Sequence, residues 1–197
     1  MIKKLSFYDF DGCLVNSPEP EEGKRIYKEK TGNDYPHKGW WGRKESLDVD
    51  IFDIKYNQNV YQRYLKDSKN PSTMTILLTN RMDKLSHDVI GLLDELNIKF
   101  DDYSFKSGSK EKVDRIKFYL TIHPNVKIID IYDDREKELV AFRQLKKEFS
   151  DKYQINIHAV ENGEIISNKF FTTLNNRIYN LYEYRRLFKE YINKIKL

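Results

Sequence analysis

Short apolar runs alternate along this chain with longer amphipathic stretches. The short runs predict strands over residues 2–9, 74–79, 100–105, 126–132 and 154–160. The amphipathic stretches predict helices near 19–31, 56–67, 83–97, 110–121 and 135–150. Strands that alternate with helices predict an α/β fold, Rossmann-like, with a parallel sheet flanked by helices and right-handed crossovers.

Two segments lie outside this simple alternation. Residues 16–72 separate the first strand from the second and are expected to form a small insert within a single domain spanning 1–197. Residues 168–197 carry an apolar stripe at helical spacing and predict a terminal helix. That helix is basic, with seven Lys or Arg against two Glu, while the whole chain is only +4. Basic and aromatic side chains together favour a nucleic-acid contact, although a solvated helix face is the plainer reading.

The first strand ends in two carboxylates. Asp9 and Asp11 follow the apolar run that begins at Leu5, and Gly12 comes directly after them. Like charges at this spacing repel one another, and burial makes them costly. A divalent cation such as Mg²⁺, which takes hard oxygen ligands, removes that cost. The alternative is that the two aspartates only cap the next segment.

A second acidic pair, Asp133 and Asp134, ends the strand predicted over 126–132. Because the carboxyl ends of parallel strands meet at one edge of a sheet, this pair is expected opposite Asp9 and Asp11. Two separate strands that both end in paired aspartates are more specific than either pair alone. Together they predict a metal site.

Between these pairs come groups suited to phosphate. Thr79, Asn80 and Arg81 end the strand over 74–79, where a hydroxyl can bond a phosphoryl oxygen and a guanidinium offers a planar fork. A helix N-cap would explain Thr79 and Asn80 but not Arg81. Lys110 and Lys112 then open a helix, a position that does not favour cations, so one of them is a candidate to neutralise an anion. The alternative is a solvated, lysine-rich surface.

The order Asp-x-Asp, strand-end Thr, helix-start Lys and Asp-Asp resembles the haloacid dehalogenase-like (HAD) superfamily over about residues 2–160. A narrower resemblance is to the HAD domain of the Swiss Army Knife RNA-repair group, and also to the 3′-phosphatase domain of phage-type polynucleotide kinase/phosphatases. It rests on four segments: residues 9–20, Gly39-Trp40-Trp41-Gly42, Leu78-Thr79-Asn80-Arg81 and Ile131-Tyr132-Asp133-Asp134-Arg135. Cys13 departs from the Thr or Val that is usual there.

The resemblance implies an HAD core with a cap in the 16–72 insert and a Mg²⁺-dependent phosphatase that forms an aspartyl-phosphate. It makes Asp9 the nucleophile and Asp11 the acid and base, with Asp9, the Asp11 carbonyl and Asp133 or Asp134 as metal ligands. Thr79, Asn80 and a lysine would hold the phosphoryl oxygens. Lys112 is favoured over Lys110, because apolar Val113 and Ile116 follow it as in the family pattern.

The insert also contains Trp40 and Trp41. One of these rings is a candidate to stack on a substrate base, as aromatic platforms do for single strands. The alternative is that both rings fill the interface between the insert and the core. Arg81 is expected beside the phosphoryl site, where its fork could hold a second phosphate or the backbone of a strand.

Composition restricts the protein class further. A hydrophobic content of 39% supports a globular core, and the single cysteine excludes an internal disulfide and suits a reducing cytoplasm. No signal peptide and no apolar run of membrane-spanning length is visible, so neither export nor a membrane is expected.

Three functions remain open at this stage. The first is a hydrolase that removes phosphate from RNA or DNA ends in nucleic-acid repair. The second is a phosphatase of small molecules or nucleotides, with the same chemistry. The third is an HAD-fold protein that binds nucleic acid without turnover, which the presence of both Asp9 and Asp11 disfavours.

Overall fold

The computed structural model describes residues 1–166. Its centre is a six-stranded sheet with the order β3-β2-β1-β4-β5-β6. The strands are β1 (Lys4–Tyr8), β2 (Thr73–Met82), β3 (Asp102–Lys106), β4 (Ile128–Asp133), β5 (Gln154–Glu161) and β6 (Glu164–Ile166). Every pairing among β1 to β5 is parallel, which confirms the α/β fold predicted from the alternating pattern.

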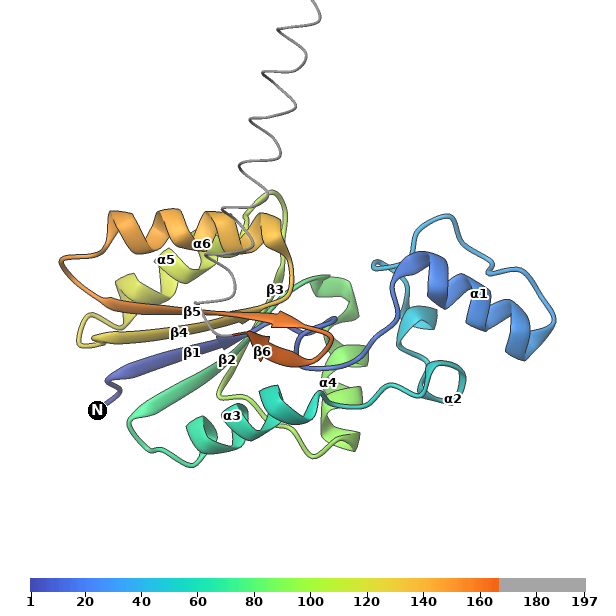
Figure 1. Ribbon diagram of the computed structural model, residues 1–197, viewed down its shortest axis with the longest axis horizontal. Coiled ribbons are helices and arrows are strands. Elements are labelled where there is room, and N and C mark those ends of the chain that lie inside the picture. Colours follow the sequence, from blue (N-terminus) through green and yellow to red (C-terminus); the bar gives the residue numbers. More distant parts are fainter. Residues whose placement is uncertain (167–197) are drawn as a thin grey trace, which may run out of the picture. The chain divides into compact units, whose positions relative to one another are not determined.

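Helices cover both faces of the sheet (Figure 1). α5 (Lys112–Ile122) and α6 (Glu136–Glu148) lie on one face, and α3 (Gln58–Ser68) and α4 (Ser86–Glu95) lie on the other. The buried residues between these layers are mostly branched aliphatic and aromatic side chains, as expected from the composition. Within the described part of the chain, no helix has the length and apolar character needed to cross a bilayer.

The insert after β1 divides into two parts. α1 (Pro20–Thr31), a 3₁₀ turn (Lys44–Leu47) and the short α2 (Val49–Phe52) project beyond the edge of the sheet (Figure 1). α3 instead packs against β2 as part of the core layer. The predicted insert of 16–72 therefore contains one helix that belongs to the core, and the projecting part is correspondingly shorter.

Some boundaries differ from the sequence-based prediction. β2 continues to Met82, so Thr79, Asn80 and Arg81 lie within the strand instead of after it. The strand can extend because its pairing with β3 shifts between Leu78 and Met82 and then resumes at Lys106. The helix expected over 83–97 begins as a 3₁₀ turn and becomes α4 at Ser86.

The strand β6 was not predicted, because three residues carry too little pattern to distinguish a strand. A two-residue turn precedes it, with positive φ at Asn162 (51°) and Gly163 (78°), as in type I′ hairpins. The basic helix predicted over 168–197 lies outside the described residues.

Candidate active site

The two acidic pairs meet at the carboxyl edge of the sheet, where β1 and β4 are neighbours. Tyr8 is paired with Tyr132, and the backbone N–H of Asp9 donates to the carbonyl of Tyr132 at 3.0 Å. This register brings carboxylate oxygens of Asp9, Asp133 and Asp134 within 4.8 Å of one another. The three side chains form an acidic group that offers the oxygen ligands a divalent cation prefers.

The loop after β1 requires a glycine for two reasons. The N–H of Leu14 donates back to the carbonyl of Asp9 at 3.2 Å, so the chain turns sharply, and Gly12 takes the left-handed φ of 69°. A Cβ atom at Gly12 would lie 2.5 Å from Oδ2 of Asp134. Gly12 therefore permits both the turn and the close approach of Asp134.

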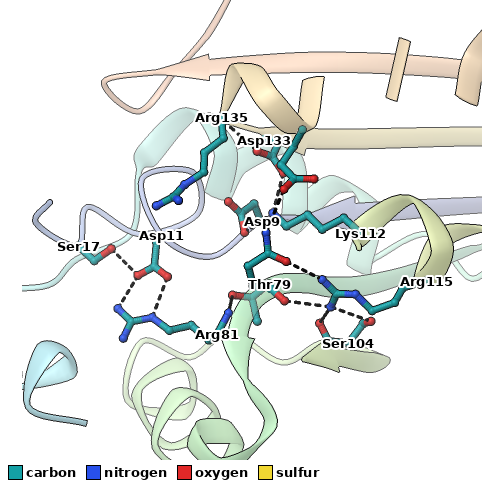
Figure 2. A network of polar contacts seen from close by, with 12 residues as sticks. Asp9, Asp11, Ser17, Thr79, Arg81, Ser104, Lys112, Arg115, Asp133 and Arg135 are labelled. Atoms are coloured by element: carbon teal, nitrogen blue, oxygen red, sulfur yellow. Dashed lines mark hydrogen bonds and ion pairs between the residues drawn. The ribbon is translucent and has the colours of Figure 1, made fainter. Parts of the chain in front are cut away.

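Lys112, the first residue of α5, is buried against the acidic group. Its Nζ lies 2.7 Å from Oδ1 of Asp9 and 2.7 Å from Oδ2 of Asp133 (Figure 2). Burial opposes the charge of Lys112, but Asp133 and Asp9 outweigh it and raise the pKa of the ammonium. Lys110 is exposed. Of the two candidate lysines, the fold brings Lys112 to Asp9.

One ammonium does not neutralise these three carboxylates, of which Asp9 and Asp133 are buried and Asp134 is half-buried. Burial raises the pKa of Asp9 to about 6, although Lys112 lowers it. Burial, followed by the charge of Asp9, raises the pKa of Asp134 to about 7. Oδ1 of Asp134 is also buried and has no hydrogen-bond partner among the described residues. A divalent cation held by Asp9, Asp133 and Asp134 would pair that oxygen and reverse both shifts, so these residues fit a metal.

The side chain of Asp11 points away from this acidic group (Figure 2). Arg81 donates from Nε to Oδ2 at 2.8 Å and from Nη2 to Oδ1 at 2.7 Å, a two-pronged pair in which both residues are buried. Ser17 donates a third hydrogen bond to Oδ1 at 2.6 Å. Three donors hold the Asp11 carboxylate in one orientation beside Asp9.

This pairing corrects the expected place of Arg81. A side chain exposed enough to meet a second phosphate was expected, but Arg81 is only 1% exposed. Its remaining donor, Nη1, bonds Ser46 Oγ at 2.5 Å and the carbonyl of Trp41 at 3.2 Å. Because every nitrogen of the fork is bonded to protein, Arg81 is placed to orient Asp11.

The two tryptophans lie in different surroundings. Trp40 is 3% exposed, donates from Nε1 to the carbonyl of Pro18, and packs where a side chain at Gly23 would stand. Trp40 is therefore a core residue of the insert, which corrects its candidate role in substrate binding. Trp41 is half-buried, and the guanidinium carbons of Arg81 and Arg135 lie 5.1 and 5.0 Å from its ring centroid.

Arg115 of α5 donates hydrogen bonds to both Thr79 and Asn80. Nη1 of Arg115 donates to the carbonyl of Thr79 at 2.9 Å, and Nη2 donates to Oδ1 of Asn80 at 2.9 Å (Figure 2). The amide of Asn80 donates in turn to Glu138 at 3.1 Å. Thr79 Oγ1 accepts from the N–H of Arg81 at 3.0 Å, which leaves its hydroxyl hydrogen as a donor for the site.

Arg115 and Ser17 were missed by the sequence analysis. Arg115 lies one turn after Lys112, on the face of α5 that is otherwise buried and apolar, and that position was a readable signal. No comparable signal marks Ser17, because its contact with Asp11 depends on the path of the loop.

The site geometry can now be compared with known proteins. Residues 17–178 match the model of the HAD domain family 1 in Swiss Army Knife RNA repair proteins. The chain belongs to this family. The matched segment begins after Asp9 and Asp11 and includes Thr79, Lys112 and the Asp133–Asp134 pair. HAD-family membership implies hydrolase chemistry and, in general, a divalent metal, and the acidic group of the structure agrees with the second.

Individual proteins are similar to the chain at low sequence identity. An uncharacterized protein of Saccharomyces cerevisiae is 25% identical over 168 residues, covering 72% of this chain and 36% of the yeast protein. The chain thus spans about a third of that relative. A haloacid dehalogenase-like family hydrolase of Streptococcus pneumoniae is 18% identical, with a TM-score of 0.48 over 80% of this chain and 84% of that one. The HAD domain of effector protein Lem4 from Legionella pneumophila is 15% identical, with a TM-score of 0.49 over 88% and 94%.

Proposed function

We propose that this HAD domain is a Mg²⁺-dependent phosphomonoesterase that transfers the phosphoryl group to Asp9. The observation that carries the proposal is the meeting of Asp9, Asp133, Asp134 and Lys112 at the end of β1 and β4. Asp9 there lies between the Lys112 ammonium and the Asp134 carboxylate, whose Oδ1 has no hydrogen-bond partner among the described residues. That arrangement suits an anionic nucleophile that must approach an anionic substrate.

The proposed reaction has two steps. In the first, Oδ of Asp9 attacks phosphorus, the bond to the ester oxygen breaks, and protonated Asp11 gives its proton to the departing alcohol. In the second, water attacks the same phosphorus, Asp11 takes a proton from the water, and inorganic phosphate leaves with Asp9 restored. A divalent cation bound to the acidic group offsets the negative charge shared by nucleophile and phosphate.

The positions of Asp9 and Asp11 support this division of roles. Asp9 belongs to the acidic group, whereas the side chain of Asp11 is turned toward Arg81 and Ser17. All three hydrogen bonds to Asp11 are donated to it, an arrangement that supports its proposed role as the base of the second step. We assign Lys112 and the Thr79 hydroxyl to the phosphoryl oxygens, with Asn80 and Arg115 supporting Thr79 from behind.

The substrate class has two candidates. Nucleic-acid ends are supported by the description of the family, whose members occur in RNA repair proteins, and by half-exposed Arg135 beside Trp41 at the rim of the site. Such a pair can hold a strand phosphate and stack on a base. A small phosphomonoester is supported by an acidic cavity that opens next to Asp134. Both candidates use the same chemistry at Asp9.

The experiment that tests the proposal is a phosphate-release assay with and without Mg²⁺. Phenyl phosphate serves as a small reference substrate beside 3′-phosphorylated oligonucleotides, mononucleotides and sugar phosphates. We expect release that needs added Mg²⁺ and stops in excess chelator. Full activity in chelator would contradict the role of the acidic group, and no release from any phosphomonoester would contradict the proposed function.

A further inference from the structure

A cavity of about 540 Å³ opens directly beside the acidic group. Gly12, Asp134 and Ser17 are among the residues that line it, and Ser17 is the residue that donates to Asp11. In the proposed reaction Asp11 protonates the departing oxygen. The alcohol that leaves with that oxygen therefore has this cavity as the adjoining space.

The walls of the cavity are acceptor-rich and carry one sign of charge. None of the described residues that line it is a lysine or an arginine. Beyond Asp134, its carboxylates are Glu19, Glu22 and Glu161. Of these, Glu19 has a cation nearby, Arg135, with its Nη2 4.0 Å away. The charge facing a bound alcohol is consequently negative.

One wall is held in place by several contacts. Asn57 donates from Nδ2 to the carbonyl of Cys13 at 2.7 Å, so it is fixed to the loop that carries Asp9 and Asp11. Gly163 of the β5–β6 turn packs so closely on Asn57 that a Cβ there would lie 2.7 Å from Oδ1. Asn59 also donates to Glu164 of the same hairpin. The hairpin that carries Glu161 is thus tied to the loop after β1 and to the start of α3.

We infer that this cavity selects phosphomonoesters whose departing alcohol carries hydroxyl or amino donors and no further negative charge. The inference rests on the proposed function and narrows its substrate class. Carboxylates accept hydrogen bonds and do not donate them, so hydroxyl and amino groups find partners on these walls. A second anionic group on the alcohol would instead face the carboxylates of Glu19, Glu22 and Glu161, which Coulomb repulsion disfavours.

The test compares three small substrates that differ chiefly in the charge of the alcohol. Ethanolamine phosphate is cationic there, glycerol 3-phosphate is neutral and 3-phosphoglycerate is anionic, while phenyl phosphate reports the basal reaction. We expect kcat/KM for the cationic and neutral substrates to exceed that for the anionic one by about tenfold or more. A 3′-phosphorylated oligonucleotide belongs with the anionic group.

Two variants test the cavity walls directly. Glu22→Gln and Glu161→Gln keep side-chain size and remove one charge each, so each is expected to reduce the discrimination against 3-phosphoglycerate about threefold. Glu21→Gln is the matched control, because Glu21 precedes Glu22 on α1 and is as exposed as Glu22 and Glu161, but does not line the cavity. The expected result for Glu21→Gln is an unchanged ratio of the substrates.

The outcomes separate this inference from the proposed function. Discrimination that falls in both cavity variants and not in the control supports the inference. Equal or better turnover of 3-phosphoglycerate or the oligonucleotide, with phenyl phosphate also hydrolysed, overturns it and leaves the phosphatase proposal intact. Absence of release from every substrate, phenyl phosphate included, contradicts the proposed function and the inference together.

Discussion

Arg81 and Asp11 form a buried two-pronged ion pair across the space between β2 and the loop after β1, with N–O distances of 2.8 and 2.7 Å. The pair gives Asp11 different surroundings from Asp9, although the two carboxylates lie only two residues apart in sequence. Asp9 is left to the acidic group, and Asp11 is fixed by donors that occupy both of its oxygens. Different surroundings for two carboxylates are the usual basis for giving them different roles in catalysis.

Loss of this pair should affect turnover more than metal binding. Arg81→Met keeps the apolar stem and removes the fork, so Asp11 loses its orientation, and we expect kcat to fall about 10²-fold or more. Affinity for Mg²⁺, measured by calorimetric titration, should stay within about twofold, because the Asp11 side chain lies outside the acidic group.

The same change should reduce stability, since a buried carboxylate loses its partner, at a cost of about 3–5 kcal/mol. Arg81→Lys provides a milder variant that keeps the charge and loses the two-pronged geometry. If either folded variant keeps wild-type kcat, Arg81 does not position a group that matters to the reaction. A parallel loss of Mg²⁺ affinity and turnover would instead place Asp11 among the metal ligands.

Gly12 should be needed for Mg²⁺ binding by the acidic group, because it leaves room for the carboxylate of Asp134. In Gly12→Ala the new Cβ would stand 2.5 Å from Oδ2 of Asp134, so the carboxylate must move away. We expect Mg²⁺ affinity to weaken by about tenfold or more, as when the support of a metal ligand is lost. The positive φ of 69° adds strain of about 1–2 kcal/mol.

A variant at a second glycine distinguishes the effect of backbone strain from the effect of displacing Asp134. Gly108 has a similar φ of 62°, and nothing lies within 4 Å of a Cβ built there. Gly108→Ala should therefore show the loss of stability alone, with Mg²⁺ affinity unchanged. Equal affinities in the two variants would show that Asp134 is not needed for the cation.

Asp130 should make stability depend on pH. Burial alone would raise the pKa of Asp130, but its contacts with His158, Lys4 and Asn156 outweigh burial and hold the pKa below its usual 3.8. Nζ of Lys4 lies 2.6 Å from Oδ2, and Asn156 donates to Oδ1 at 2.7 Å. A folded-state pKa below the unfolded one means that the ionised group contributes stability above about pH 5 and loses it as pH falls further.

Asp130→Asn keeps the shape of the side chain and removes the titration. We expect it to lower the free energy of unfolding by about 2 kcal/mol at pH 7, measured in urea. The difference from wild type should shrink as the pH is lowered from 5 toward 3, because the unfolded wild-type chain then binds a proton at Asp130 while the folded protein keeps the charge to lower pH. A difference that stays constant over that range would contradict the ionic role of Asp130.

The sequence predicted the fold and the two acidic pairs because both depend on local patterns. β-branched runs specify the strands, and an aspartate after a buried strand falls at the carboxyl edge wherever the strand lies in a parallel sheet. Lys112 was favoured over Lys110 for its place in a motif, and the fold brings Lys112 to Asp9. These features need no knowledge of which elements pack together.

The partners of charged side chains could not be predicted in the same way. Arg81 offers the same fork to a carboxylate as to a phosphate, and only the path of the loop shows that Asp11 reaches it first. Trp40 and Trp41 are adjacent in sequence, yet one packs on Gly23 and the other lies against two guanidinium groups. Such contacts join segments that are distant in sequence, and the pattern of one segment does not contain them.

The proposed mechanism requires that Asp9 becomes phosphorylated during turnover. The most direct measurement is a rapid acid quench of the protein with phenyl phosphate and Mg²⁺, followed by mass spectrometry of the peptide that contains Asp9. We predict one added phosphoryl group on Asp9 that hydroxylamine removes, as expected for an acyl phosphate, and no such adduct in Asp9→Asn. Turnover with no adduct on Asp9, or undiminished turnover in folded Asp9→Asn, would contradict the role of Asp9 as the nucleophile.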